Sequence, residues 1–332
     1  MTRSWRLLLA LAGTALLVAM VWVIGPDVIA NGVREAGWWL LPILALHAVV
    51  YALNALAWWV ALPPTADRPS LGAAFRISVI GFAMNFVTPI VNAGGEPYRI
   101  AALAPTLGTA RATGVVLLYV LIHAVSSLLL WLTAIALALT TLPLDAATRS
   151  ALGVALALVL AALAVVLAGQ RGGVVVRLAR LLERLRLRRL SAWLAGRRDG
   201  LATVDAELVR TWHERPRALV AAVGFDTLAR IAGAGEFLLV AHALGVALTP
   251  TSALLMWGLL ALAMNLFFLF PWELGSREGS LLAVSTLAGM PIGFTGLAMV
   301  AGRLRELSWA AIGVALLWSE SRRPLTPPRT PP

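Results

Sequence analysis

Apolar residues dominate this chain in long runs that are separated by short polar segments. A run of roughly 20 apolar residues is long enough to cross the hydrocarbon core of a bilayer as one helix. Several runs approach or exceed that length, which predicts membrane-spanning helices. They are residues 7–24, 38–62, 112–139, 151–168, 218–244 and 292–318. A cleaved signal peptide is the alternative for the first run, but that run exceeds the usual signal length.

Two further apolar regions, 71–104 and 251–290, are each interrupted by polar residues. The first interruption is NFVTPIVNAGGEPYR, from Asn85 to Arg99, and a related stretch, NLFFLFPWELGSREG, follows at 265–279. Proline disfavours a helix before it, and glycine lets the backbone turn. Non-helical backbone at membrane depth survives only where protein buries it or where it lines a wet cavity. We therefore predict broken helices at polar sites.

The arms of the first interrupted region are short. They cover residues 71–86 and 97–104, and we expect the second arm to stop at Ala104 because Pro105 follows. Neither arm reaches the roughly 20 residues that a span requires. The pair is therefore predicted to be a re-entrant hairpin, which enters and leaves the membrane on one side.

The composition is typical of a polytopic membrane protein. The chain has 332 residues, is 60% hydrophobic and only 13% charged, and has a mean hydropathy of +0.85. A soluble domain carries about 25% charged residues. We therefore predict an all-α helix bundle. The chain has no cysteine, so neither a disulfide framework nor a thiolate metal site can form. The four histidines are scattered, and we expect no cofactor.

The net charge is +11, and the chain has arginine but no lysine. Residues 170–217 hold 12 Arg against five acidic residues. Leucines at helical spacing there indicate a helix in the interface of an anionic leaflet, or else a solvated helical hairpin. We expect anionic lipid headgroups as the partner of this segment, and no nucleic acid. The Pro- and Arg-rich tail, 321–332, is predicted to be disordered, after a single transmembrane domain over 1–320.

Charge also predicts the topology. Arg-rich loops stay cytoplasmic, which places both termini and the 170–217 segment inside. Counting spans from the N-terminus then requires residues 71–104 to enter and leave the membrane on the cytoplasmic side, and residues 251–290 to enter and leave it on the outer side. The two hairpins would be inverted pseudo-repeats, an arrangement that many transporters use to bring broken helices together near the midplane.

The two interruptions resemble the signatures of the lysylphosphatidylglycerol synthase transmembrane-region family, also called flippase-like domain proteins. The first signature, N-x3-P-x5-GE-x2-R, is matched by Asn85, Pro89, Gly95, Glu96 and Arg99. The second, P-x-x-x-G-x-R-E, is matched by Pro271, Gly275, Arg277 and Glu278. The family usually has a Gly-rich stretch after that proline, where this chain has Trp272 and Glu273.

The resemblance implies a bundle of about six to eight spans that moves a lipid between leaflets of the bacterial cytoplasmic membrane. The substrate would be a phospholipid or a polyprenyl-linked lipid. In the lysyl-lipid synthases the transferase is a separate soluble domain. This chain has no room for one, so we expect no enzyme activity. A scaffold for a lipid-modifying enzyme and a membrane-embedded lipid-phosphate enzyme are the alternatives. A homo-oligomer is left open.

Ionisable side chains at membrane depth cost about 2.5–3.5 kcal/mol each and are therefore candidates for a site. They are Glu96, Arg99, Asp226, Arg230, Glu273, Arg277, Glu278, Arg303 and Arg305. Asn85 joins them, and we expect it to satisfy backbone groups that the first break frees.

Our hypothesis is that Arg99, Arg277 and Arg303 line a cavity and hold a lipid phosphate, because a guanidinium binds phosphate with two hydrogen bonds. Glu96 and Glu278 would pair with these arginines when the site is empty, or take up a proton. The alternative is that the charged residues are ion pairs that lock the hairpins. Asp226 and Arg230 are four residues apart and can pair on one helix face. Arg76 and Glu306 are expected to be structural or interfacial.

Overall fold

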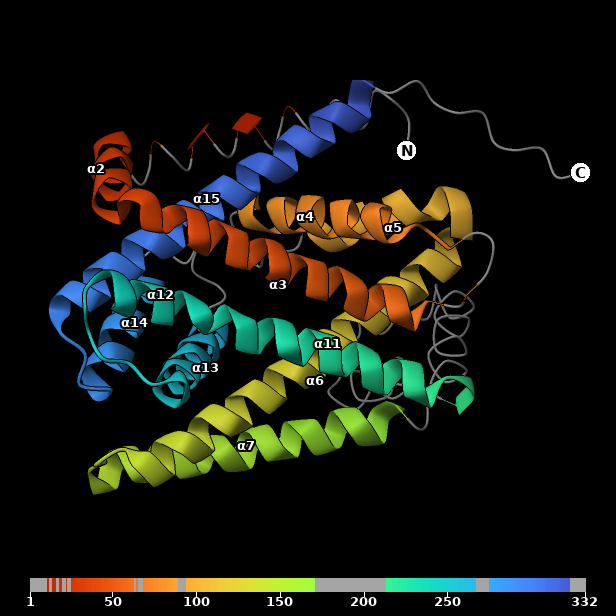
Figure 1. The fold of residues 1–332 in the computed structure, drawn as a ribbon. Coiled ribbons are helices and arrows are strands. Elements are labelled where there is room, and N and C mark those ends of the chain that lie inside the picture. The colour runs from red at the N-terminus through yellow and green to blue at the C-terminus, as the bar shows by residue number, and fades with distance from the viewer. Residues whose placement is uncertain are drawn as a thin grey trace, which may run out of the picture.

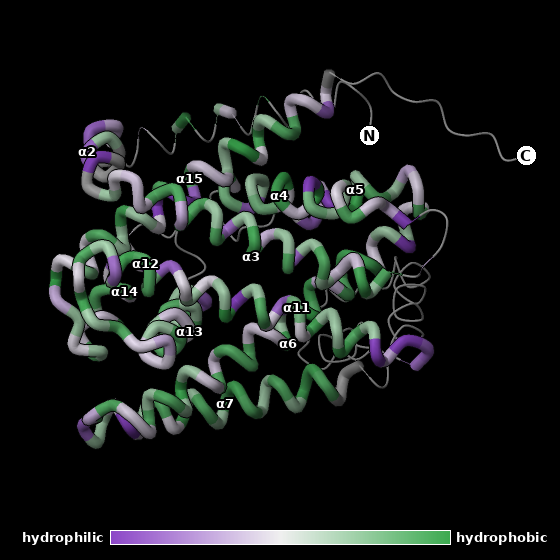
Figure 2. The backbone as a smooth tube through the Cα atoms, in the orientation of Figure 1, coloured by the Kyte–Doolittle hydropathy of each residue, from purple (hydrophilic) through white to green (hydrophobic). Residues whose placement is uncertain are grey.

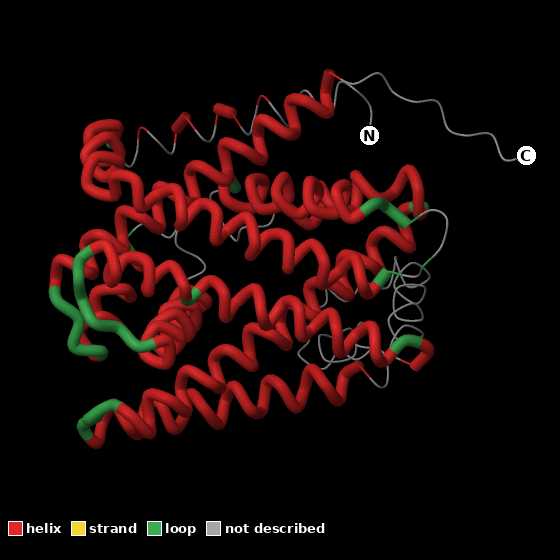
Figure 3. Tube along the Cα trace, viewed as in Figure 1, coloured by secondary structure: helices red, strands yellow, loops and turns green. Residues whose placement is uncertain are grey.

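The computed structural model is helical, and no strand occurs among the residues that it describes (Figures 1 and 3). These are residues 25–62, 64, 68–88, 94–170, 213–266 and 275–322, with six single positions between 11 and 22. Glu273 and the predicted interfacial helix within 170–217 therefore lie outside the described residues, and so does most of the predicted first span.

The helices follow one another along the chain with short connections. They are α2 (Pro26–Ala36), the 3-10 turn η1 (Gly37–Trp39), α3 (Leu40–Ala61), α4 (Leu71–Val87), α5 (Gly95–Leu107), α6 (Thr109–Thr141), α7 (Ala146–Gln170), α11 (Pro216–Gly233), α12 (Gly235–Ala243), α13 (Pro250–Leu266), α14 (Ser276–Leu287) and α15 (Ile292–Arg322).

Four stretches of the described chain are long and apolar enough to cross a membrane. They are Gly37–Ala61, Thr109–Thr141, Ala146–Leu167 and Pro216–Ala243. Each matches a span that the sequence predicts, and Figure 2 shows the apolar colouring of α7 along most of its length. The last stretch is divided, because α11 ends at Gly233 and α12 begins at Gly235.

The bundle has two ends, which we name after their connections. At the Gly108 end, α3 stops, α4 starts, α5 stops and α6 starts. The start of α11 lies there too, because Arg215 donates hydrogen bonds to the carbonyls of Ala61 and Val60 at the end of α3. At the Asp145 end, α6 turns into α7 and α12 into α13 (Figure 1). Antiparallel α3 and α6 thus connect the two ends.

Two short hairpins enter the bundle from opposite ends. The pair α4 and α5 contact each other, and both are continuous with the Gly108 end. The pair α13 and α14 also contact each other, and both are continuous with the Asp145 end. At 17, 13, 17 and 12 residues, all four helices fall short of a full span. The predicted inverted hairpins are confirmed.

Helix boundaries differ from the predicted ones at both restarts. The helix α5 begins at Gly95 and runs through Pro105 to Leu107, so the predicted stop at Ala104 is wrong. Pro105 lies inside α5, where it removes one backbone donor, and Gly108, with a φ of 76°, ends the helix instead. The second restart begins at Ser276, inside the interrupted stretch 265–279 itself, directly after Gly275 with a φ of 78°.

The tip of the first hairpin, where α4 ends, lies near the middle of α15. The helices α4 and α15 run antiparallel. Arg76 of α4 pairs with Glu320 of α15 at 2.9 Å, and a Cβ added at Gly313 of α15 would lie 2.8 Å from the Val79 carbonyl oxygen of α4. Val87, at the end of α4, belongs to the same apolar cluster as Ala310. The break after α4 therefore lies within about a turn or two of Glu306.

Candidate functional site

The break between α4 and α5 is closed by polar side chains. The Asn85 side-chain oxygen accepts a hydrogen bond from the Gly95 backbone N–H at the start of α5, and its amide donates to Glu96 Oε1 at 3.3 Å. Arg99 Nη1 donates to the same Glu96 oxygen at 3.0 Å. The expected role of Asn85 and the expected pairing of Glu96 with Arg99 are both confirmed.

The Arg99 guanidinium lies between helices α4 and α6. A Cβ added at Gly81 of α4 would lie 2.7 Å from its Nε, and its Cζ lies 4.9 Å from the centre of the Tyr119 ring of α6. Only 7% of Arg99 is exposed, and its Nε has no hydrogen-bond partner. Only glycine at position 81 allows this close approach.

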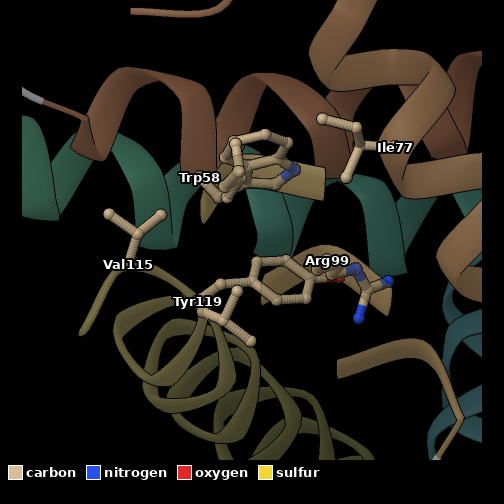
Figure 4. A pocket seen from close by; sticks show the side chains of 7 residues that line it. Trp58, Ile77, Arg99, Val115 and Tyr119 are labelled. Carbon is tan, nitrogen blue, oxygen red and sulfur yellow. The ribbon is translucent and has the colours of Figure 1, made fainter. Parts of the chain in front are cut away.

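A narrow pocket of about 10 Å³, room for about one water molecule, lies beside Arg99 (Figure 4). Besides Arg99, its lining is almost entirely apolar. The other lining side chains are Trp58, Ile77, Leu103, Val115, Val116 and Tyr119. Neither Arg277 nor Arg303 lines it. The structure thus places Arg99 alone of the three predicted phosphate-binding arginines at this pocket.

The second restart builds a matching pair. Glu278 Oε2 accepts from the Gly275 backbone N–H at 2.9 Å and so caps the start of α14. Glu278 Oε1 accepts from Nη2 of Arg303, on α15, at 2.8 Å. The glutamates of the two breaks are similarly exposed, Glu96 at 33% and Glu278 at 34% of the side chain, whereas their arginine partners are 8% and 11% exposed. Each break therefore presents a carboxylate with a guanidinium behind it.

Glu306 is the centre of the charged cluster on α15. Its carboxylate accepts from Nη1 of Arg277 and, at 3.2 Å, from Nη2 of Arg305. Nη1 of Arg303 lies 3.6 Å from its other oxygen. Three guanidinium groups thus share one carboxylate, which agrees with the structural role that we expected for Glu306.

The cluster ends in the deepest part of the bundle. Nη1 of Arg305 donates to His47 Nε2 of α3 at 2.7 Å, and its Nε lies 3.2 Å from Glu236 of α12. Glu236 is 1% exposed and His47 is 3% exposed. We name the α15 cluster as His47, Glu236, Arg277, Glu278, Arg303, Arg305 and Glu306. Its three arginines and three glutamates balance, as a buried charge network requires.

A third polar group joins α6 to α11. Asp226, fully buried, accepts from the Ser126 hydroxyl and lies 3.3 Å from Arg230 Nε, which confirms the predicted pairing of Asp226 with Arg230. The His123 Nδ1 donates to both carboxylate oxygens, at 3.1 and 3.2 Å. The Ser126 hydroxyl donates to Asp226 and to the backbone carbonyl of His123 rather than to the His123 ring, so the three side chains do not form a serine–histidine–aspartate relay.

Sequence reasoning missed several members of these groups. It gave no site role to His47, His123, Ser126 or Glu236, because the charged side chains that they contact lie on other helices. The pairs of Asp226 with Arg230 and of Glu96 with Arg99 were predictable, since their members are three or four residues apart on one helix. The partners of Glu236 and Glu278 lie far along the chain and depend on the fold.

Comparison with known proteins adds a family. The family described as "Lysylphosphatidylglycerol synthase TM region" matches residues 7–314. A "UPF0104 membrane protein" of Methanothermobacter thermautotrophicus is 30% identical over 93 residues, and the match covers 28% of this chain and 28% of that protein. No solved structure matches the chain.

Proposed function

Because the chain belongs to the lysylphosphatidylglycerol synthase TM-region family, we propose that this multi-pass membrane protein moves an anionic or lipid-linked substrate between the leaflets of its membrane. One observation carries the proposal. Two short hairpins enter from opposite ends, and each has at its break a glutamate that is about one third exposed and paired with an arginine, Arg99 of α5 or Arg303 of α15. Broken helices that meet inside a bundle are a recurring way to build a substrate site in transporters.

The proposed mechanism is an exchange of ion-pair partners. With no substrate, Glu96 holds Arg99 and Glu278 holds Arg303. A lipid phosphate offers a guanidinium the same two-oxygen geometry as a carboxylate, so it replaces the glutamate without leaving a buried charge unpaired. The released glutamate is the more exposed partner. It is then solvated by water or takes up a proton. The hairpins from the two ends then serve the two leaflets in turn.

We further propose that the chain performs no covalent chemistry on the lipid. The polar side chains of the α15 cluster bond to one another, and Ser126 is engaged by Asp226 and Arg230. A nucleophile needs an adjacent base that takes its proton, and the Asp226 carboxylate beside Ser126 is a weak base because Arg230 and His123 also hold it. The membrane would be the bacterial cytoplasmic membrane, with both termini and the Gly108 end on the cytoplasmic side.

The test is leaflet exchange in liposomes that contain the purified protein. The liposomes would carry fluorescent anionic phospholipid, zwitterionic phospholipid or polyprenyl phosphate. The variants are Glu96→Gln, Arg99→Ala, Arg277→Ala and Glu278→Gln. We expect the wild type to exchange one lipid class and each variant to slow that exchange at least tenfold.

The matched control is Arg76→Ala, which also removes an arginine from a glutamate pair but lies outside the two breaks. It should exchange lipid at nearly the wild-type rate. Absence of exchange for every lipid, with and without a proton gradient, would reject transport and favour a scaffold for a lipid-modifying enzyme. Chemical change of the lipid would favour an enzyme instead.

A further inference from the structure

Glu236 and His47 meet inside the bundle as two facing hydrogen-bond acceptors. Nη1 of Arg305 donates to His47 Nε2 at 2.7 Å, so this nitrogen carries no hydrogen, and Nδ1 donates to the Ile43 carbonyl at 3.1 Å. Glu236 Oε2 lies 3.5 Å from the same Nε2. A carboxylate oxygen also only accepts. The contact between the two side chains therefore lacks the hydrogen that would make it favourable.

The Glu236 oxygen is also short of donors. Glu236 and His47 are 1% and 3% exposed, and each lies on one of the candidate spans. Oε2 of Glu236 has no hydrogen-bond partner in the described part of the chain. Nε of Arg305 is 3.2 Å away, but it too makes no hydrogen bond among the described residues. Buried polar atoms are nearly always paired in proteins, so this oxygen requires a donor.

A complete pair of the same kind occurs elsewhere in the chain. His123 donates from Nδ1 to Asp226 at 3.1 and 3.2 Å, so a hydrogen lies between that ring and its carboxylate. A proton on Glu236 Oε2 would supply the hydrogen that the other pair lacks, because the carboxyl group could then donate to His47 Nε2. Arg305, which now donates to that nitrogen, would release it.

The surrounding charges decide when such a proton is bound. The charged groups that act on both side chains are Arg277, Arg305 and Glu306, and the Tyr51 phenol is also close enough to interact with Glu236. Two guanidiniums thus balance two carboxylates, and an added proton would leave a buried positive charge. An anion that draws Arg277 away from Glu306 removes this balance, and one proton then restores it.

We propose that Glu236 and His47 form a proton-binding site, which fills when an anion takes Arg277 from Glu306. Arg277 is 11% exposed and Glu236 only 1%, so the anion binds at the more exposed edge of the α15 cluster and the proton at its deep end. By linkage, each ligand strengthens the binding of the other. That this anion is the transported substrate rests on the proposed function, and the pair then couples its movement to a proton.

The test reproduces the loss of Arg277 without any ligand. Arg277→Gln leaves Arg305 facing both carboxylates, as a bound anion would. Purified protein in detergent would be titrated from about pH 9 to about pH 6, a window in which ordinary carboxyl groups stay ionised and arginine does not titrate. We expect Arg277→Gln to take up about one proton more than the wild type. Arg305→Gln should do the same and covers the case in which the first variant misfolds.

A second substitution locates the proton. Adding His47→Gln to Arg277→Gln should abolish the extra uptake, because the glutamine amide can donate to Glu236 in place of the proton. A proton held by Glu306 would be unaffected. Each double variant is compared with its own single histidine variant, so that titration of the ring itself cancels.

Two matched controls use the same substitutions elsewhere. Adding His123→Gln to Arg277→Gln should leave the extra proton in place, because His123 faces Asp226 and not Glu236. Arg76→Gln, which removes an arginine from its pair with the partly exposed Glu320, should take up no extra proton.

Absence of the extra proton in the folded arginine variants would overturn the inference, and so would an extra proton that persists with His47→Gln. The proposed function fails differently. Loss of all leaflet exchange with the extra proton present would remove transport and leave the proton site, whereas leaflet exchange in a protein without the extra proton would remove the site and leave transport.

Discussion

At the scale of single residues, the α15 cluster depends on one carboxylate. Glu306 faces Arg277, Arg303 and Arg305, and its side chain is only 14% exposed. A buried guanidinium that loses its anion keeps the cost of desolvation without the compensating attraction. Glu306 therefore matters more to stability than a glutamate that pairs with one exposed arginine.

We predict that Glu306→Gln, which keeps the size of the side chain, lowers the free energy of unfolding in detergent by about 3–5 kcal/mol, because it leaves buried arginines short of a partner. The control is Glu320→Gln, which weakens the more exposed pair with Arg76 and should cost no more than about 1 kcal/mol. Equal losses in the two variants would show that Glu306 is not central to the cluster.

At the scale of elements, small residues let the helices of the first hairpin approach closely. A Cβ added at Gly95 would lie 2.8 Å from the Asn85 side chain and would overlap the Gly81 carbonyl oxygen. The Gly81 site differs, because its obstacle is the flexible end of Arg99. The close contact of α4 with α5 is what places Glu96 beside Asn85.

We predict that Gly95→Ala destabilises the protein by about 1–3 kcal/mol, since the backbone of α4 must move away. Gly81→Ala should cost less, because the Arg99 side chain can shift. Gly72→Ala, also on α4, meets nothing within 4 Å and should be neutral or stabilising by up to about 1 kcal/mol. Thermal unfolding of the three variants in detergent would rank them, and a different order would contradict the close-packing argument.

At the scale of the whole molecule, the inverted hairpins give the bundle two distinct ends. Arg68, Arg111, Arg215 and Arg217 gather at the Gly108 end, where α7 ends and α11 begins. Basic residues at the ends of membrane helices favour the cytoplasmic side. The helix α6 has 33 residues and is about 50 Å long, so both its ends project beyond a hydrocarbon core of about 30 Å.

We predict that Thr141→Cys reacts with a membrane-impermeant maleimide in intact cells, whereas Thr109→Cys reacts only after the cells are opened. Both positions are exposed, and the chain has no cysteine to give background labelling. Thr141 marks the Asp145 end and Thr109 the Gly108 end. The opposite labelling pattern would reverse the orientation that we propose.

Much of the architecture was predictable because it depends on local chemistry. Apolar runs of sufficient length become helices, and Pro and Gly at Asn85 to Arg99 break one of them. Helix ends were less predictable. Pro105 indicated a stop, but α5 continues through it for two more residues and ends at Gly108, whose φ is 76°.

The sequence by itself determined the class of protein, the two breaks and the ion pairs between residues three or four apart. These depend on hydropathy and on helix geometry, which need no neighbour. Only the tertiary structure decided that Glu306 gathers three arginines, that Glu236 lies beside His47, and that Asp226 orients His123. The physical reason is that a buried charge must find its partner wherever the packing of helices places one, and that partner can be 258 residues away, as His47 is from Arg305.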